Sequence, residues 1–129
     1  MIYEKRNIEK INTLTQKGIL MAKEWIGKLK TAKREVLITS GYRTKSEQDA
    51  LYALGRTKPG KIVTNNKGGT SSHNFHIAID FCPVDNKGNL LWSDVKKFKQ
   101  YAAVAKMCGF EWGGDWKKFP DQCHLQYKD

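Results

Sequence analysis

The segment Thr70–Asp80, with the sequence TSSHNFHIAID, contains two of the three histidines of the chain and an aspartate. The remaining histidine, His124, follows Asp121 by three residues in the turn-like segment FPDQCH. Two imidazoles and one carboxylate with an open fourth position form a catalytic zinc arrangement. Such a zinc lowers the pKa of its bound water towards ~7, and a nearby carboxylate can take the released proton. We therefore consider His73, Asp80 and His124 as ligands and Asp121 as a base.

Spacing decides which of these residues can share one ion. The alternation from His76 to Val84 predicts a half-buried strand with His76 and Asp80 on one face. Those two side chains are ~13 Å apart along a strand that rises ~3.3 Å per residue, so one ion cannot easily bind both. His73 precedes the strand, and a chain reversal or a neighbouring strand could bring it beside Asp80. Spacing alone leaves a second interpretation open, in which the histidines are polar surface groups or hydrogen-bonded core groups.

The composition is typical of a soluble globular protein, because 40% of the 129 residues are hydrophobic and 28% are charged. This length is sufficient for one domain with one buried core. No apolar run approaches the ~20 residues of a membrane helix. The net charge of +10 indicates an anionic partner, such as nucleic acid, a membrane surface or an acidic wall polymer. No zinc-finger or RNP motif supports nucleic-acid binding.

The cysteines and the N-terminal segment bear on the cellular compartment. The number and spacing of Cys82, Cys108 and Cys123 argue against a complete disulfide framework and against a CxxC pair. We expect them to be reduced core residues, as in a reducing compartment. The N-terminal segment MIYEKRNIEKINTL lacks the apolar core of ~7–15 residues that a signal peptide contains. These features predict a protein that stays in the cytoplasm until another factor releases it.

In the first half of the chain, apolar periodicity predicts two helices and one strand. The first helix is expected from about Asn12 to Ala32, although Gly18 weakens it. The β-rich segment Glu35–Ser40 predicts a short buried strand. Ser46–Leu54 is expected to form a short helix whose first residue is the N-cap. Loop-forming residues lie on both sides of the KIVT segment that follows.

In the second half, turn signals separate several short elements. The predicted strand at His76–Val84 is followed by a turn at Asp85–Asn89 and by a further strand at Leu90–Trp92. Ser93 is expected to cap a helix that ends at Gly109, and FEWGG and HLQY are expected to form the last strands. This mixture of helices and antiparallel strands indicates an α+β fold rather than a doubly wound parallel sheet.

The spaced polar residues form a pattern that resembles the zinc peptidases of the VanY and D-alanyl-D-alanine carboxypeptidase superfamily: Ser71-x-His73-x-x-x-x-Ala78-x-Asp80, then Asp121-x-x-His124. The resemblance continues through Ser40–Gly69 and Gly109–Trp116. It is greatest to L-alanyl-D-glutamate endopeptidases of phage endolysins and bacterial wall-remodelling enzymes. It implies a hedgehog/D,D-peptidase-like α+β fold, a small antiparallel sheet with flanking helices, and a single catalytic domain over residues 1–129.

The resemblance also implies roles for individual residues. His73, Asp80 and His124 would hold Zn²⁺, and Asp121 would be the catalytic base. Arg43 in the segment SGYR would contact the substrate and steady the developing oxyanion. This role suits a guanidinium, because it binds carboxylates and oxyanions in a forked geometry.

Three further residues are candidates for substrate binding. Gln48 could support the site from its predicted helix, and Trp112, together with Trp116, could wall a groove; core packing is an equal interpretation for Trp112. His76 occupies a position where the family pattern has glycine, so we expect an ordinary backbone there and a side chain that projects towards the cleft face. That side chain could touch substrate, bind a second metal or be inert.

We therefore expect a zinc-dependent peptidoglycan hydrolase that cleaves the L-alanyl-D-glutamate bond of the stem peptide. Its partner would be bacterial peptidoglycan, with no nucleic acid and no stable membrane association, and we expect a monomer. One alternative is a D-alanyl-D-alanine carboxypeptidase with the same fold. A second is a non-catalytic basic cell-wall-binding module, which would bind without cleaving and would be indifferent to a chelator.

Overall fold

The structure, a computed structural model, describes residues 1–129. It contains four α-helices, two short 3-10 helices and four strands in the following order: α1 (Glu4–Ile11), α2 (Gln16–Thr31), β1 (Glu35–Ser40), α3 (Lys45–Ala53), η1 (Ser72–Phe75), β2 (Ala78–Val84), α4 (Val95–Met107), β3 (Glu111–Trp112), η2 (Gly113–Asp115) and β4 (His124–Gln126). This mixed order and the antiparallel sheet confirm the predicted α+β class. No helix is both long enough and apolar enough to cross a membrane.

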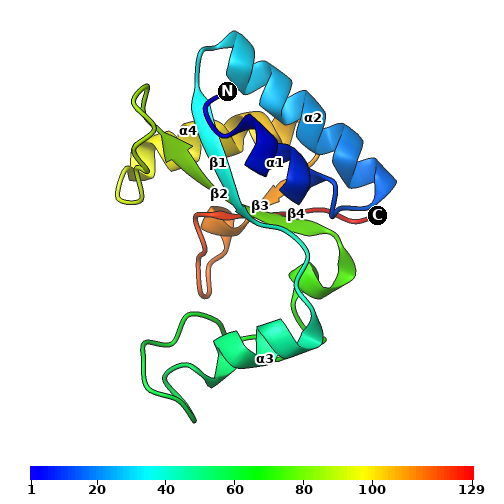
Figure 1. The fold of residues 1–129 in the computed structure, drawn as a ribbon, viewed down its shortest axis with the longest axis vertical. Helices are drawn as coiled ribbons and strands as arrows, with labels where there is room; N and C mark the ends of the chain where they lie inside the picture. The colour runs from blue at the N-terminus through cyan, green and yellow to red at the C-terminus, as the bar shows by residue number, and fades with distance from the viewer.

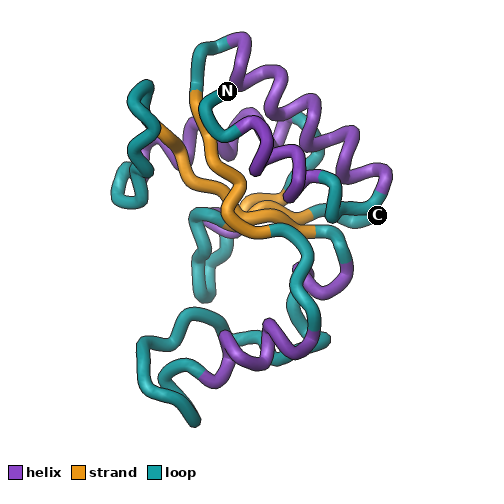
Figure 2. The backbone as a smooth tube through the Cα atoms, viewed as in Figure 1, coloured by secondary structure: helices purple, strands orange, loops and turns teal.

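The four strands form one antiparallel sheet in the order β1-β2-β4-β3, drawn in orange in Figure 2. In its register, Asp80 of β2 lies opposite Ser40 of β1 on one side and opposite His124 of β4 on the other. Side chains of residues that are directly opposite in a sheet lie on the same face. The register therefore places these three polar side chains in a row across three strands.

The other face of the sheet carries the hydrophobic core. Ile79 and Phe81 alternate with Asp80 along β2, and both are completely buried. The Phe81 ring packs against Trp25 of α2 and Phe98 of α4, with 5.3 Å between ring centroids in each pair. The helices thus cover one face of the sheet, while the row of polar side chains occupies the other.

Helices α1 and α2 are tied to the sheet at specific points. The buried Asn7 side chain of α1 donates to the carbonyl of Val36 and accepts from the N–H of Ile38, both on β1. On α2, Gly18 lies directly against the Tyr127 ring, where any Cβ would collide with the hydroxyl group. Gly18 therefore weakens the helix locally but permits close packing there.

Helix α3 and the loops around it form a separate lobe, residues 44–70, which we call the α3 lobe. Figure 1 shows it apart from the other helices, at the opposite end of the molecule. Thr44 caps α3 in a reciprocal arrangement, since its hydroxyl accepts from the Glu47 N–H and the Glu47 carboxylate accepts from the Thr44 N–H. The predicted N-cap, Ser46, was therefore wrong by two residues.

The helix predicted from about Asn12 to Ala32 is confirmed as α2, which begins four residues later, whereas α1 before it was not predicted. The chain breaks between α1 and α2, where the Thr13 hydroxyl donates to the Lys10 carbonyl and accepts from the Tyr42 N–H. A residue that hydrogen-bonds its neighbouring backbone competes with helix continuation. The break turns the N-terminal segment back so that α1 covers β1, which periodicity alone did not indicate.

Three boundaries in the second half also differ from the prediction. Strand β2 begins at Ala78 and is buried along its whole length, rather than half-buried from His76. The predicted strand at Leu90–Trp92 is reduced to a single bridge between Leu90 and Val84. Asp94, not Ser93, caps α4 by accepting from the Lys97 N–H. Both caps are short oxygen-bearing residues, so composition alone could not choose between them.

Candidate active site

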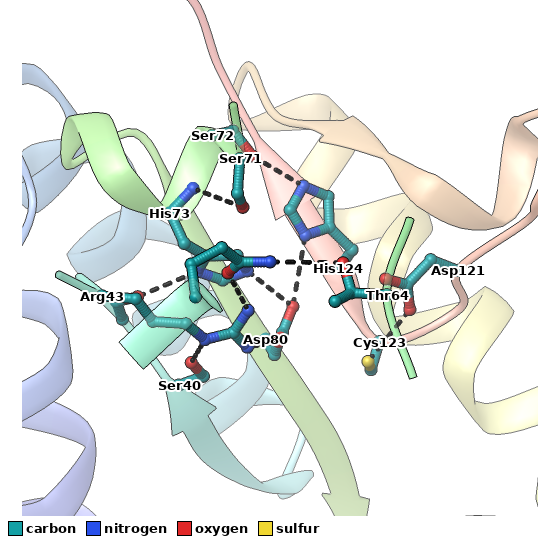
Figure 3. Close-up of polar contacts among 12 residues, drawn as sticks. Ser40, Arg43, Thr64, Ser71, Ser72, His73, Asp80, Asp121, Cys123 and His124 are labelled. Carbon is teal, nitrogen blue, oxygen red and sulfur yellow. Dashed lines mark hydrogen bonds and ion pairs between the residues drawn. The ribbon is translucent and has the colours of Figure 1, made fainter. Parts of the chain in front are cut away.

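The row of polar side chains on the open face of the sheet receives a second histidine from outside the sheet. His73 lies in the short helix η1, which precedes β2 and carries the ring back over the strand, as Figure 3 shows. Its Nε2 lies 3.2 Å from Asp80 Oδ1, and Nδ1 of His124 lies 3.2 Å from the same oxygen. One ligand atom from each of these three residues falls within 4.8 Å of the others. The structure thus brings the three predicted ligands together.

The outer nitrogen of each imidazole is held by a fixed acceptor. His73 Nδ1 donates to the Gly41 carbonyl oxygen at 2.8 Å. His124 Nε2 donates to Gln126 Oε1 at 2.8 Å, and Ser72 Oγ lies 3.2 Å from the same nitrogen. A proton fixed on the outer nitrogen leaves the lone pair of the neutral ring on the inner nitrogen. In the neutral rings both inner lone pairs then face the Asp80 carboxylate, whereas in the protonated rings the inner N–H groups donate to it.

Burial and charge act in opposite directions on these groups. Burial alone would raise the pKa of the Asp80 carboxyl, but hydrogen bonds and positive charge from His124 and His73 outweigh it, so the pKa lies well below its ordinary value. Burial would lower the pKa of His124, but its bonds to Asp80 and Gln126 raise it above the ordinary value. Negative charge is therefore concentrated on Asp80, where it favours a cation.

The donor set suits zinc. Neutral imidazole nitrogens and a carboxylate are ordinary zinc ligands, and three protein ligands leave one position for water or substrate. Each histidine also has the outer hydrogen bond that ligating histidines usually make. The three side chains are buried, so little reorganisation of the protein would be needed to bind an ion.

Arg43 adds a positive charge on the opposite side of Asp80. Its Nη2 donates to Asp80 Oδ2 at 2.9 Å, its Nε to Ser40 Oγ, and its Nη1 to Gln48 Oε1. A guanidinium has five N–H donors, so these three bonds leave two available. Thus Oδ1 of Asp80 contacts the two histidines, and Oδ2 contacts Arg43.

Gln48 supports Arg43 and does not face the open cleft. It is completely buried, and its amide nitrogen donates to Thr64 Oγ1 and to the carbonyl of Asn66. Its predicted supporting role agrees with this geometry, whereas direct substrate contact does not, because the side chain is enclosed. Gln48 joins α3, the Thr64–Asn66 loop and Arg43 in one network.

Asp121 and Cys123 lie on the other side of the candidate metal ligands, away from Arg43 (Figure 3). Their carboxylate oxygen and sulfur fall within 4.8 Å of each other and of an Asp80 oxygen, and Cys123 Sγ donates to Asp121 Oδ1 at 3.1 Å. Burial, together with the charges of Asp80 and Asp121, raises the pKa of the Cys123 thiol far above its ordinary value. The thiol therefore acts as a neutral donor that orients the carboxylate.

These side chains line one hollow of about 530 Å³. Its walls come from the α3 lobe, from η1 and from the segment around β4. The lining residues that bear on chemistry are Arg43, Ser72, His73, Asp80, Trp116, Asp121, Cys123, His124 and Gln126. The arrangement can hold a cation, take up a proton at Asp121 and offer the spare N–H groups of Arg43 to an oxygen of a bound substrate.

The sequence is similar to those of known peptidases. Residues 64–127 match a family model described as D-alanyl-D-alanine carboxypeptidase. The peptidoglycan L-alanyl-D-glutamate endopeptidase CwlK of Bacillus subtilis is 44% identical over 100 residues, which cover 71% of this chain and 60% of that protein. The L-alanyl-D-glutamate peptidase of Listeria phage A118 is 32% identical over 127 residues, covering 97% of this chain and 42% of that protein. The chain is thus similar to the VanY and D-alanyl-D-alanine carboxypeptidase superfamily of peptidases.

Solved structures of this superfamily share the fold. The Serratia marcescens L-Ala D-Glu endopeptidase ChiX superposes with a TM-score of 0.73 at 19% identity, covering 95% of this chain and 86% of that one. The vancomycin-resistance D,D-pentapeptidase VanY, solved with Zn(II), superposes with a TM-score of 0.66 at 16% identity, covering 88% and 72%. The hedgehog/D,D-peptidase-like architecture expected from the sequence is therefore confirmed. The chain spans 60% and 42% of the lengths of the two relatives described above, CwlK and the phage peptidase.

Two of the candidate substrate contacts, Trp112 and His76, do not line the hollow. Trp112 belongs to the hydrophobic core and donates its indole N–H to the Gln122 carbonyl, so it does not wall the hollow. Trp116 lines the hollow instead. His76 is exposed but turned away, with its Nδ1 bonded to the Thr13 carbonyl at 2.7 Å.

The His76 backbone also differs from the expectation. Its φ of 61° and ψ of 30° are left-handed, so the chain keeps the conformation that glycine favours without having glycine there. The imidazole stacks on Tyr42, with 3.9 Å between ring centroids and 4° between planes. This stack and the bond to Thr13 fix the turn that carries His73 back over β2.

Sequence reasoning missed Gln126, Ser72 and Cys123. Gln126 accepts from His124 and donates to Glu111 Oε2 at 3.1 Å. A signal for it was present, since residues two apart in a strand share a face, and Gln126 follows His124 by two. Ser72 and Cys123 had no such signal, because their places depend on loop conformations outside regular strands.

Proposed function

We propose that the protein is a zinc-dependent peptidoglycan hydrolase that cleaves the amide bond between L-alanine and D-glutamate in the stem peptide. The proposal rests mainly on one observation: two imidazoles with hydrogen-bonded outer nitrogens and one carboxylate converge beside a second carboxylate, Asp121, in an open hollow. The names of the two relatives, both L-alanyl-D-glutamate peptidases, support this choice of bond.

His73, Asp80 and His124 would hold the zinc ion. Bound there, the ion would polarise the substrate carbonyl and lower the pKa of a water molecule. Asp121 would accept a proton from the attacking water and return it to the leaving amine of D-glutamate. Its carboxylate is oriented for this by the Cys123 thiol.

Arg43 would bind the carbonyl oxygen of the substrate as negative charge develops on it. Three of its donors are occupied by Ser40, Gln48 and Asp80, which hold the guanidinium in place before the reaction. Donors that are positioned in advance stabilise developing charge without reorganisation during the reaction. The two spare N–H groups are the ones available for this contact.

The basic surface would favour approach to the anionic cell wall. The net charge of +10 predicts that wall association weakens as salt concentration rises. We further propose that the protein acts as a monomer without stable membrane association. It would remain in the cytoplasm until a pore releases it to the wall, as in a phage endolysin.

The test is mass spectrometry of purified stem-peptide muropeptides after incubation with the protein, with and without a zinc chelator. Fragments that begin with D-glutamate, abolished by chelator and restored by added Zn²⁺, are the expected result. Loss of one D-alanine would instead assign a carboxypeptidase. Absence of cleavage with zinc bound at unit stoichiometry would reject catalysis and assign a binding module.

A further inference from the structure

The catalytic hollow continues into a second hollow of about 480 Å³. The two share four lining residues, Val63, Asn66, Trp116 and Asp121. The proposed base, Asp121, therefore stands at the junction, and a substrate positioned for proton transfer at Asp121 can extend from one hollow into the other. The second hollow lies between the Ile62–Asn66 segment of the α3 lobe and the segment that leads into β4.

The charges along this joined groove are unevenly distributed. Besides the histidines, its cationic lining residues are Arg43 in the first hollow and Lys118 in the second. Arg43 is already paired with Asp80. Lys118 is exposed and, unlike Lys30 and Lys106, forms no ion pair within the chain. Lys118 is thus the lysine in the groove that is free to meet an anionic group of a substrate.

The backbone next to Lys118 is unusual. Phe119 has a φ of 52°, in the left-handed region that aromatic residues rarely adopt, and its ring is 72% exposed. The bend there lets both Lys118 and Asp121, three residues apart, line the second hollow. The Asp121 backbone is fixed by a hydrogen bond from its N–H to the Gly113 carbonyl at 2.9 Å. Strained backbone that presents side chains to a cleft is a common feature of functional sites.

The proposed substrate carries a negative charge close to the bond that breaks. In the stem peptide D-glutamate continues the chain through its γ-carboxyl group, so its α-carboxylate is free and is attached to the carbon that bears the scissile nitrogen. A carboxylate at this place would lie near Asp121, the proposed proton donor to that nitrogen. An unneutralised carboxylate beside Asp121 would be repelled by it.

We propose that Lys118 is a specificity-determining residue that pairs with the free α-carboxylate of D-glutamate in the second hollow. This inference rests on the proposed function, because it takes the L-alanyl-D-glutamate bond as the one cleaved. An ammonium on a flexible four-carbon stem suits a monodentate carboxylate contact at an exposed rim. The pair would offset the repulsion by Asp121 and would disfavour substrates in which this carboxylate is amidated.

The test compares two synthetic stem peptides that differ only at this group, one with the free α-carboxylate and one with the α-carboxamide. The wild-type protein, loaded with zinc, should cleave the acid with a kcat/KM about fivefold higher, the scale of a partly exposed ion pair. Lys118→Met should bring this ratio close to one, mainly by raising KM for the acid. Lys118→Glu should invert the preference.

Lys117→Met is the matched control, because Lys117 is also exposed but lines neither hollow. It should keep the wild-type ratio. An unchanged ratio in Lys118→Met, or equal losses on both peptides, would overturn the assignment while leaving the proposed function intact. If the zinc-loaded wild type cleaves neither peptide at the alanyl-glutamate bond, the proposed function and this inference both fail. Thermal denaturation of each variant checks that folding is unaffected.

Discussion

The two walls of the candidate active site are built differently. The sheet face presents Asp80 and His124 from paired strands, and both residues are buried with their polar atoms bonded. The α3 lobe presents the Ile62–Asn66 segment, in which no backbone–backbone hydrogen bond forms. Ile62 and Val63 on this segment are 57% and 60% exposed.

This difference between the walls suits two functions, metal binding on the sheet and substrate contact on the α3 lobe. Residues proposed to bind metal need a fixed geometry, and the sheet provides it through register and burial. Residues that meet a polymeric substrate can tolerate local motion, and segments with few backbone bonds and few buried contacts open at low free-energy cost. Arg43 and Gln48 connect the two walls, so they determine how far one can move relative to the other.

The largest effect is expected when the proposed base or a proposed metal ligand is replaced. Asp121→Asn should lower kcat by about 10²–10⁴ because it removes the proton acceptor, while zinc stoichiometry stays at the wild-type value. His73→Ala should instead lower zinc affinity, since one of three ligands is lost. Peptide hydrolysis and metal analysis of the same samples distinguish the two. Full activity in Asp121→Asn would remove it from the mechanism.

A smaller effect is expected at the connection between the walls. Gln48→Leu should destabilise the protein by about 1–3 kcal/mol, because it removes the hydrogen bonds that a completely buried amide makes to Arg43, Thr64 and the Asn66 carbonyl. Denaturant unfolding measures the change. Gln100→Leu, an exposed position, serves as the control and should stay within about 0.5 kcal/mol. Equal effects would mean that Gln48 does not couple the lobe to the sheet.

The stability of the protein should also fall at alkaline pH, because the sheet contains a buried thiol. Burial raises the pKa of Cys82 on β2 from 9.0 to about 11. A group whose pKa is higher in the folded state stabilises that state below the unfolded pKa and loses this contribution as pH rises, here between about pH 9 and 11. The free energy of unfolding should therefore decline over this range, and less steeply in Cys82→Ala. An identical slope in the variant would contradict the assignment to Cys82.

The smallest effect is expected at His76, which lies outside both walls. His76→Gly relieves the backbone strain of a non-glycine residue in the left-handed region, but it removes the hydrogen bond to Thr13 and the stacking on Tyr42. These opposing changes should nearly cancel, leaving stability within about 1 kcal/mol and hydrolysis within about twofold of wild type. A tenfold loss of kcat/KM with unchanged folding would instead show that His76 contacts substrate.

Residue types at fixed spacing made His73, Asp80 and His124 candidate ligands, and the resemblance to the superfamily favoured that role over ordinary polar groups. The strand at Glu35–Ser40 could be predicted from its β-rich composition. The break near Thr13 could not be predicted, since it depends on a bond to a residue far along the chain.

The sequence left two interpretations open for Trp112 and for Gln48, and the physical reason is the same for both. An aromatic or amide side chain near a functional segment can face either the cleft or the interior, and only tertiary packing decides which. Trp112 faces the core with its N–H satisfied by a carbonyl, and Gln48 is enclosed with both ends of its amide bonded. His76 differs, because its backbone conformation is fixed by the turn rather than by its own preference.

The central place of β2 and β4 in the sheet has a consequence for folding kinetics. The contact of Asp80 with His124 joins residues 44 positions apart, and that of Arg43 with Asp80 joins residues 37 apart. Contacts between distant residues form slowly because a long loop must close first. The candidate metal site should therefore assemble only as the sheet completes. The time at which the protein first binds zinc during refolding should then mark the completion of the sheet.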